Sequence, residues 1–293
     1  MKVVIIGASI AGHTVAVSLR QARPDYSITL ITRSAYPAYD KRRLLDYLTG
    51  SVKEKDLLLV PPDFYQQNNI EFLKECEAVS VAPVRKQLSY HNKAGRRETC
   101  AYDYLVVCSG AGTVLPEVDG IHKEGVYTLD SLADFKSFRS HLISDPVCIM
   151  GSGSNALSLA HALAGKQKEV KVISRDAGGG DTSVEILSTD VVELIGEGGI
   201  QAVRLAEGKI IGTRLPVFMP EPKKANTGFL KDVELDASGR IIVDDAMCTS
   251  VPAVYASGAV CTRRDPVQDN KSWDDVINES KVLADDLARS MGG

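Results

Sequence analysis

The chain has no long apolar run, no Cys-x-x-Cys pair and no excess of basic side chains. A membrane-spanning helix needs about 20 consecutive apolar residues, so we expect no membrane partner. The formal net charge of −4 excludes the strong basic field that attracts nucleic acids, so we expect no nucleic-acid partner either. The first residues show no charged leader or cleavage site, which favours a cytoplasmic protein.

Side chains for acid, base or nucleophilic catalysis are sparse. The six cysteines are irregularly spaced, which indicates reduced thiols rather than a zinc site or a redox pair. The five histidines form no pattern with a serine or cysteine nucleophile, so we expect no catalytic residue and no metal. His13 follows a glycine turn and would reach a phosphate there, although an ordinary helix histidine is the favoured interpretation.

The composition is that of a globular protein with a sizeable core. Of the 293 residues, 44% are hydrophobic and 25% are charged. At roughly 100–200 residues per domain, this length predicts two domains.

Two segments far apart in the sequence show the same β-α-β pattern. The first predicts a strand at residues 2–6, a helix that includes 14–20 and a strand at 27–32. The second predicts a strand at 147–150, a helix through residue 163 and a strand at 170–174. Such units form parallel sheets with right-handed crossovers, so an α/β fold follows.

The remaining segments give weaker signals. We expect a helix after Pro61 and Pro62, a buried strand at 104–107, a loop at 176–181 and an irregular connection at 215–224, where three prolines occur. Short strands at 241–243 and 253–256 precede an amphipathic helix at 272–290, for which Ser272 is the expected N-cap.

The first glycine motif lies between the first strand and helix. It reads Gly7-Ala8-Ser9-Ile10-Ala11-Gly12. Glycines at a strand-to-helix turn let the backbone N–H groups of the helix N-terminus approach a dinucleotide pyrophosphate. We therefore predict a dinucleotide site here; the alternative is a tight turn without a ligand.

The second motif reads Gly151-Ser152-Gly153-Ser154-Asn155-Ala156, and we predict a second dinucleotide site there. An acidic residue that would bind ribose is missing after both second strands, where Thr32 and Ser174 stand. Ser174 and Arg175 would accommodate a 2′-phosphate, which favours NADPH over NADH; a solvated surface charge is the alternative for Arg175.

Further landmarks accompany these motifs. They are Tyr39-Asp40-Lys41-Arg42-Arg43-Leu44-Leu45, Tyr102-Asp103-Tyr104-Leu105-Val106-Val107-Cys108-Ser109-Gly110 and Tyr255-Ala256-Ser257-Gly258. With both glycine motifs, the chain resembles the FAD-dependent pyridine nucleotide-disulfide oxidoreductases, in particular the rubredoxin and ferredoxin reductases and the flavin domain of nitrite reductases.

The resemblance implies two Rossmann-like dinucleotide-binding domains, the second inserted into the first. Residues 1–112 and 239–293 would bind FAD, and a shortened insert at 113–238 would bind NADH or NADPH. The implied FAD contacts are Gly7, Ser9, Ile10, Ala11, Gly12, Thr32, Arg33, Lys41, Arg42, Val79, Ser109, Gly110, Gly258, Ala259 and Trp273. The implied NAD(P) contacts are Gly151, Gly153, Ser154, Asn155, Ser174 and Arg175.

Several positions depart from the pattern of these reductases. Ala259 stands where an aspartate normally binds the ribityl hydroxyls of FAD, and Arg42 stands where thiol-dependent relatives have a reactive cysteine. Met219 and Pro220 replace a glycine of the insert, and we expect the C-terminal interface domain usual in these reductases to be absent. The resemblance implies an NAD(P)H oxidoreductase that passes electrons through FAD to a small electron-acceptor protein or partner subunit. The alternative is a flavin- or nucleotide-binding subunit without nicotinamide turnover, used for assembly, sensing or electron relay.

Overall fold

The computed structural model describes residues 1–142, 145–151, 153–166, 168–175, 184–221, 223–264 and 271–289. The chain forms two compact units. The first contains Met1–Asp40, Leu58–Ala111 and Lys224–Gly293, and the second contains Lys41–Leu57 and Gly112–Lys223. The loop predicted at residues 176–181 lies outside the described residues. Within the described residues, no helix combines the length and apolar character needed to cross a membrane.

The first unit is built on a five-stranded parallel sheet in the order β18-β7-β1-β2-β3. Its strands are β1 (Lys2–Ile6), β2 (Ser27–Thr32), β3 (Ile70–Lys74), β7 (Tyr104–Val107) and β18 (Val254–Ala256). The strands predicted at 2–6, 27–32 and 104–107 are confirmed. Parallel sheets are covered on both faces, which explains why these strands are runs of apolar residues rather than alternating patterns.

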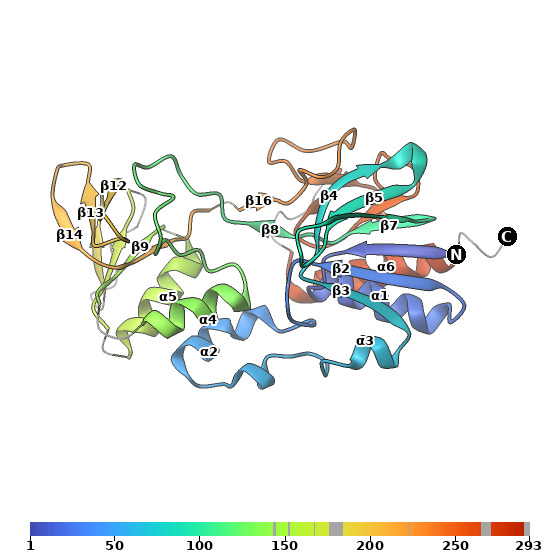
Figure 1. Cartoon of the computed structure of the whole chain (residues 1–293), viewed down its shortest axis with the longest axis horizontal. Helices are drawn as coiled ribbons and strands as arrows, with labels where there is room; N and C mark the ends of the chain where they lie inside the picture. Colours follow the sequence, from blue (N-terminus) through green and yellow to red (C-terminus); the bar gives the residue numbers. More distant parts are fainter. Residues whose placement is uncertain are drawn as a thin grey trace. The chain divides into compact units, whose positions relative to one another are not determined.

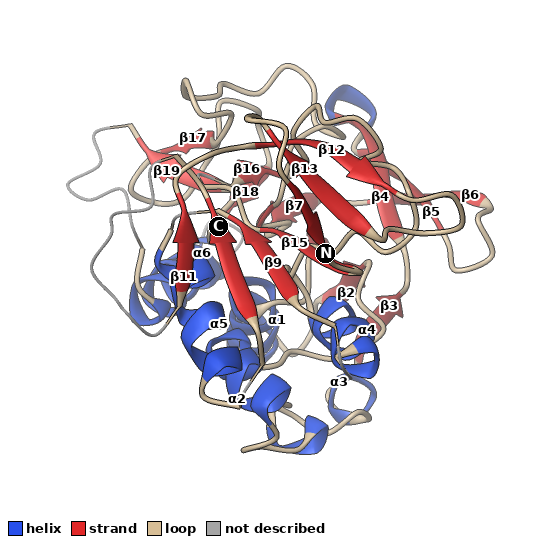
Figure 2. Ribbon diagram, turned by 90° about the vertical axis from the view of Figure 1, so that its left-hand side faces the viewer, coloured by secondary structure: helices blue, strands red, loops and turns tan. Residues whose placement is uncertain are grey.

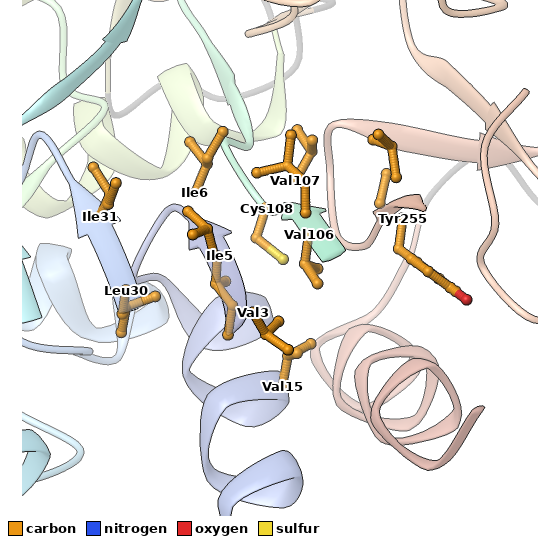
Figure 3. Packing of buried hydrophobic residues seen from close by; sticks show 14 of the residues in the cluster. Val3, Ile5, Ile6, Val15, Leu30, Ile31, Val106, Val107, Cys108 and Tyr255 are labelled. Atoms are coloured by element: carbon orange, nitrogen blue, oxygen red, sulfur yellow. The ribbon is translucent and has the colours of Figure 1, made fainter. Parts of the chain in front are cut away.

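Two helices far apart in the sequence pack side by side on this sheet: α1 (Ile10–Ala22) and α6 (Trp273–Arg289) (Figure 1). Figure 3 shows Val15 of α1 next to Val3 and Ile5 of β1, and all three are fully buried. The predicted N-cap of α6 is confirmed, because the Ser272 hydroxyl accepts the Asp275 N–H at 3.1 Å and the Asp275 carboxylate accepts the Ser272 N–H at 2.9 Å.

Smaller elements complete the first unit. An antiparallel sheet consists of β4 (Glu77–Ala82), β5 (Gln87–His91) and β6 (Arg97–Ala101), and a parallel pair consists of β17 (Ile241–Val243) and β19 (Cys261–Arg263). The helix predicted after Pro62 is only the single turn α3 (Phe64–Gln67), and η3 (Pro83–Arg85) joins β4 to β5. Strands β8 (Ala111–Gly112) and β16 (Lys224–Ala225) lie where the chain passes between the units.

The second unit has a four-stranded parallel sheet in the order β11-β10-β9-β15. Its strands are β9 (Val147–Met150), β10 (Val170–Ile173), β11 (Glu185–Leu187) and β15 (Leu215–Phe218). Helix α5 (Ser154–Ala164) packs against β9 and β10 (Figure 2). A separate antiparallel sheet contains β12 (Val191–Ile195), β13 (Ala202–Leu205) and β14 (Ile210–Gly212). The predicted β-α-β unit at 147–174 is therefore confirmed.

The irregular connection predicted at residues 215–224 is wrong for its first part, because Leu215–Phe218 forms the buried strand β15. This strand lies at the edge of its sheet, beside β9. The Pro216 carbonyl accepts the Tyr127 N–H at 3.0 Å on the side away from β9. The nitrogen of the same residue faces that side too, so the sheet needs no N–H from Pro216 and tolerates the proline.

The segment at residues 41–57 packs within the second unit. It contains η1 (Lys41–Arg43), α2 (Leu44–Thr49) and η2 (Glu54–Asp56), and α2 contacts α5 and α4 (Leu132–His141). The guanidinium of Arg139 donates to the Tyr47 carbonyl at 3.0 Å and lies 4.7 Å from the centre of the Tyr47 ring. These contacts explain why residues 41–57 are grouped with the second unit.

Candidate functional site

The first glycine turn connects β1 to α1. Gly7 has a φ of +103°, and a Cβ atom at this residue would overlap the carbonyl of Cys108. A Cβ on Gly12 would overlap the carbonyl of Gly7, so the first turn of α1 rests directly on the strand end. Ser9 is the N-cap but forms no side-chain cap, and the first turn of α1 has no acidic residue among the described positions. The N–H groups of Ile10, Ala11 and Gly12 thus lie in a first turn that offers donors to an anion.

The turn at Gly258 and Ala259 lies beside this helix N-terminus. Gly258 has a φ of +87°, and a Cβ atom there would lie 3.1 Å from the Cβ of Ala11. Ala259 is exposed. The preceding residue, Ser257, holds the turn in place: its N–H donates to the Val107 carbonyl at 3.0 Å, and its hydroxyl lies 2.8 Å from that of Ser280. The structure therefore brings residues 258–259 to the glycine turn from the far end of the chain.

Ser109 and Gly110 are held by Asn226. The Ser109 hydroxyl donates to the Asn226 carbonyl at 2.7 Å, and the Asn226 amide donates to the Ser109 carbonyl at 3.0 Å. The Asn226 N–H also donates to the Gly110 carbonyl at 2.9 Å. Three hydrogen bonds to one residue fix the loop after β7, so Ser109 and Gly110 have a defined position in the first unit.

The other residues predicted to contact FAD are spread over several elements. Thr32 ends β2 and is buried, and its hydroxyl accepts the Ser34 N–H at 3.2 Å. Arg33 is exposed and pairs with Glu77 at 3.6 Å. Val79 lies at an irregularity in β4 and is 37% exposed, and Trp273 is the half-buried first residue of α6.

Lys41 and Arg42 belong to η1 in the second unit. The Lys41 ammonium donates to the carbonyl of Asp130 at 3.4 Å. Both residues are therefore grouped with α4 and α2 rather than with the turn at Gly7.

The second glycine turn connects β9 to α5. Gly151 has a φ of +153°, and a Cβ atom there would overlap the carbonyl of Met219, whose N–H donates to the Met150 carbonyl at 2.8 Å. Gly153 is the N-cap of α5, and Ala156 is fully buried in the position of the third motif glycine. Ser152 lies outside the described residues.

A cavity of about 460 Å³ lies at the carboxyl ends of the strands of the second sheet. Its lining includes the last residues of three parallel strands, Met150, Ile173 and Phe218, together with Gly151 and Ser174. Open α/β sheets bind their ligands at this edge. The volume lies in the range of small-molecule sites, so the second unit holds a candidate nucleotide pocket.

The carboxylate of Glu221, a residue that lines this pocket, occupies the space beside Gly153, the middle glycine of the motif. A Cβ atom built on Gly153 would overlap the carboxylate of Glu221, which lies three residues after β15. The Asn155 amide donates to the same carboxylate at 3.1 Å. Helix α5 has no acidic residue in its own first turn and no side-chain cap from Gly153, so Glu221 supplies the negative charge at this helix N-terminus.

Ser174 and Arg175 follow β10, as the motif predicts, and Ser174 lines the pocket. The Arg175 guanidinium is largely exposed and forms an ion pair with Asp190, which also lines the pocket. A 2′-phosphate at Arg175 would have to share the guanidinium with Asp190.

His13 behaves as the helix histidine that the sequence favoured. Its Nδ1 lies 2.9 Å from the Tyr65 hydroxyl, its ring contacts Phe64 and Tyr65, and burial lowers its pKa. All six cysteines are free thiols. Burial raises the pKa of Cys148 and of Cys261 to about 11, and it raises the pKa of Cys108 as well, so these thiols stay protonated at neutral pH.

Sequence reasoning missed three residues of these sites: Asn226, Asp190 and Glu221. Their partners are 117, 15 and 66 residues away along the chain, respectively. The replacement of a glycine by Met219 and Pro220 is the only signal in the motif region that points toward the segment of Glu221.

Comparison with known proteins gives a consistent result for the fold. A profile of the family described as pyridine nucleotide-disulphide oxidoreductase matches residues 1–178. A protein of Methanocaldococcus jannaschii named NADH oxidase is 24% identical over 288 residues, covering 88% of this chain and 62% of that protein. A protein of Ectopseudomonas oleovorans named rubredoxin-NAD(+) reductase is 27% identical over 321 residues, covering 100% of this chain and 80% of that protein. The chain thus spans 62% of the first relative's length and 80% of the second's.

A solved structure gives the same match in three dimensions. The water-forming NADH oxidase of Lactobacillus brevis, in its complex with NADH, superposes with a TM-score of 0.88 at 20% sequence identity. The match covers 98% of this chain and 69% of the oxidase. This likeness confirms the predicted α/β fold with Rossmann-type parallel sheets.

Proposed function

The chain belongs to the pyridine nucleotide-disulphide oxidoreductase family, and on that basis we propose that it is an FAD-dependent oxidoreductase that takes electrons from NADH or NADPH. One observation carries the proposal: each unit places a glycine turn at the carboxyl end of a central parallel strand, where a helix begins. Because these turns suit a dinucleotide pyrophosphate, the first would hold FAD and the second NAD(P)H.

The residues of the first turn fit the pyrophosphate of FAD. Because Gly7 and Gly12 have no Cβ atoms, α1 packs closely against the strand end, and the N–H groups of its first turn would point toward a pyrophosphate bound there. Ser109 and Gly110, fixed by Asn226, border the same sheet edge after β7. We propose that Arg33, Val79, Gly258, Ala259 and Trp273, all in the first unit, add to this site.

The residues of the second turn fit a dinucleotide once Glu221 moves. Gly151 and the N-terminus of α5 would face the pyrophosphate, and Ser174 and Arg175 would face the adenosine ribose. FAD, when bound, supplies the hydride acceptor, so the protein has to bind and orient the cofactors and exclude water, without an acid or base of its own. The protonated buried cysteines agree with a reaction that uses no protein thiol.

We further propose that the electrons leave to a small electron-acceptor protein or a partner subunit. Relatives named rubredoxin-NAD(+) reductase and probable ferredoxin reductase, 27% identical to this chain, support this class of acceptor. The division by cofactor, with FAD on residues 1–112 and 239–293 and NAD(P) on 113–238, is part of the same proposal.

The absorption spectrum of the purified protein tests the function. We expect the absorption spectrum of bound FAD. Anaerobic addition of NADH or NADPH should bleach the flavin absorption band in the blue region. An unchanged flavin spectrum after both nucleotides would reject the oxidoreductase.

A second candidate is a flavin-binding subunit without nicotinamide turnover. The contact between the Glu221 carboxylate and Gly153 favours this second candidate, because the carboxylate lies where the pyrophosphate of NAD(P)H would bind. Stable flavin content together with an unchanged spectrum after NADH and NADPH would select this alternative.

A further inference from the structure

Residues before and after Glu221 in the sequence are held by contacts of their own. Before it, Met219 is fixed, because its N–H donates to Met150 and its carbonyl lies against Gly151. Pro220 then restricts the backbone. After it, the Lys223 ammonium forms an ion pair with the Asp130 carboxylate, which also accepts the N–H of Thr113 at 2.7 Å.

The Asp130 anchor is electrostatically firm. Burial alone would raise its pKa, but the hydrogen bonds from Lys223 and Thr113 more than offset burial, so the pKa of Asp130 is lowered. Asp130 therefore stays ionised at neutral pH and keeps Lys223 in place. Met219, held by its contacts with Met150 and Gly151, thus brings the nearby Glu221 carboxylate to the start of α5.

The N-terminus of α5 attracts an anion, and this carboxylate is the anion that it receives. Gly153 leaves room that a side chain would otherwise fill, and the Glu221 carboxylate fills it. The Asn155 side chain donates to the carboxylate, as it would donate to a phosphate oxygen. Two other helices, α4 and α6, are capped by residues of their own first turn, Ser131 with Asp134 and Ser272 with Asp275.

We propose that Glu221 is an internal competitor for the pyrophosphate subsite of the second unit, which a nicotinamide dinucleotide must displace in order to bind. The inference rests on the proposed function, in which this unit binds NAD(P)H. Two negative groups cannot share the space above Gly153, so the carboxylate lowers dinucleotide affinity through both its volume and its charge.

Calorimetric titration of the full chain with ADP-ribose, NADH and NADPH tests this. ADP-ribose carries the pyrophosphate without the nicotinamide, so it reports on the subsite itself. In Glu221→Ala we expect all three ligands to bind at least about tenfold more tightly than in the wild type. In Glu221→Gln the gain should be smaller, because the amide keeps the volume and loses only the charge.

Glu197→Gln is the matched control, since Glu197 is an exposed carboxylate of the same unit that does not line the pocket. It should bind all three ligands within about twofold of the wild type. A thermal melt without ligand gives a second readout. Loss of the negative charge at the N-terminus of α5 should lower the Tm of both Glu221 variants slightly, although the same variants bind the ligands more tightly. The Gln variant preserves the shape of the side chain if the Ala variant folds poorly.

The outcomes separate the inference from the proposed function. If the wild type binds the ligands and the Glu221 variants bind equally or more weakly, the function stands and the inference fails. If Glu197→Gln gains as much affinity as the Glu221 variants, the net charge of the unit explains the effect and the specific role of Glu221 fails. If no protein binds any of the three ligands, the nucleotide function of the second unit fails and the inference with it. Binding by the variants alone would support the inference and favour the subunit without nicotinamide turnover.

Discussion

Both glycine turns begin in the same way and differ at their middle position. Gly7 and Gly151 have positive φ values, and a Cβ on either would overlap a backbone carbonyl, that of Cys108 or of Met219. At the middle position the first turn has Ser9, which forms no side-chain cap, whereas the second has Gly153 with the Glu221 carboxylate above it. The backbone path of each turn is therefore set by close packing against the backbone of a neighbouring segment, whereas the space beside Gly153 is occupied by a side chain.

This difference separates two roles of glycine in one motif. Gly7, Gly12 and Gly151 are required because backbone atoms approach them closely, and backbone atoms cannot easily move away. Gly153 is approached by the end of an exposed and flexible side chain. A substitution that adds one methyl group should therefore have very different effects at these positions.

The largest effect is expected for Gly12→Ala. Alanine is a better helix former, but its Cβ would overlap the Gly7 carbonyl, so steric overlap should dominate. We expect a loss of about 1–3 kcal/mol in the free energy of unfolding and of most bound FAD. Denaturant titration and the flavin-to-protein absorbance ratio measure both.

Gly198→Ala is the control for this variant, because no atom lies within 4 Å of a Cβ at Gly198 and its φ is not positive. Wild-type stability and flavin content in Gly12→Ala would show that α1 does not rest on the strand end as described.

The next largest effect concerns the acceptor missing beside the first turn. Ala259 is exposed and follows Gly258, which packs near Ala11 of α1. If FAD binds at this turn, Ala259→Asp should offer an acceptor to its ribityl hydroxyls and raise the affinity by about 1–2 kcal/mol, roughly five- to thirtyfold. Flavin fluorescence on dilution measures the dissociation constant. Ala259→Asn separates hydrogen bonding from charge, and weaker binding in both variants would place the flavin elsewhere.

A smaller effect is expected at the rim of the second pocket. Arg175 is exposed and paired with Asp190, so a 2′-phosphate gains only part of its charge. Arg175→Ala should weaken NADPH binding by about two- to fivefold and leave NADH binding unchanged. Competitive titration of the two nucleotides gives the ratio. An equal loss for both would mean that Arg175 acts on the pocket as a whole and does not select the 2′-phosphate.

The sequence predicted what local patterns determine. Both β-α-β units, the strand bounds at 2–6, 27–32 and 147–150, and the Ser272 cap follow from periodicity and capping within a few residues. Strand β15 was missed, because Pro216 argues against a strand unless the edge position is known.

Contacts between residues that are far apart in the sequence could not be predicted from such local patterns. The Asn226 bonds to Ser109 and the Glu221 contact with Gly153 depend on tertiary packing, and no spacing in the sequence encodes them. The packing of α2 within the second unit is of the same kind, since it depends on Arg139 reaching Tyr47.

The smallest effect is expected for Gly153→Ala. A nearly unchanged stability in this variant is the sharpest test of the difference between the two glycine turns. The φ of −69° and ψ of 167° at Gly153 suit alanine, so the backbone adds no strain. The three atoms nearest to the added Cβ all belong to the Glu221 carboxylate, which can swing toward solvent because the residue is exposed. Alanine is a poorer N-cap than glycine, but it also reduces the freedom of the unfolded chain, and these two terms nearly cancel. The free energy of unfolding should therefore stay within about 0.5 kcal/mol of the wild type. A loss as large as that of Gly12→Ala, in parallel denaturant titrations, would show that Glu221 is held as rigidly as a backbone carbonyl and that the two turns are alike.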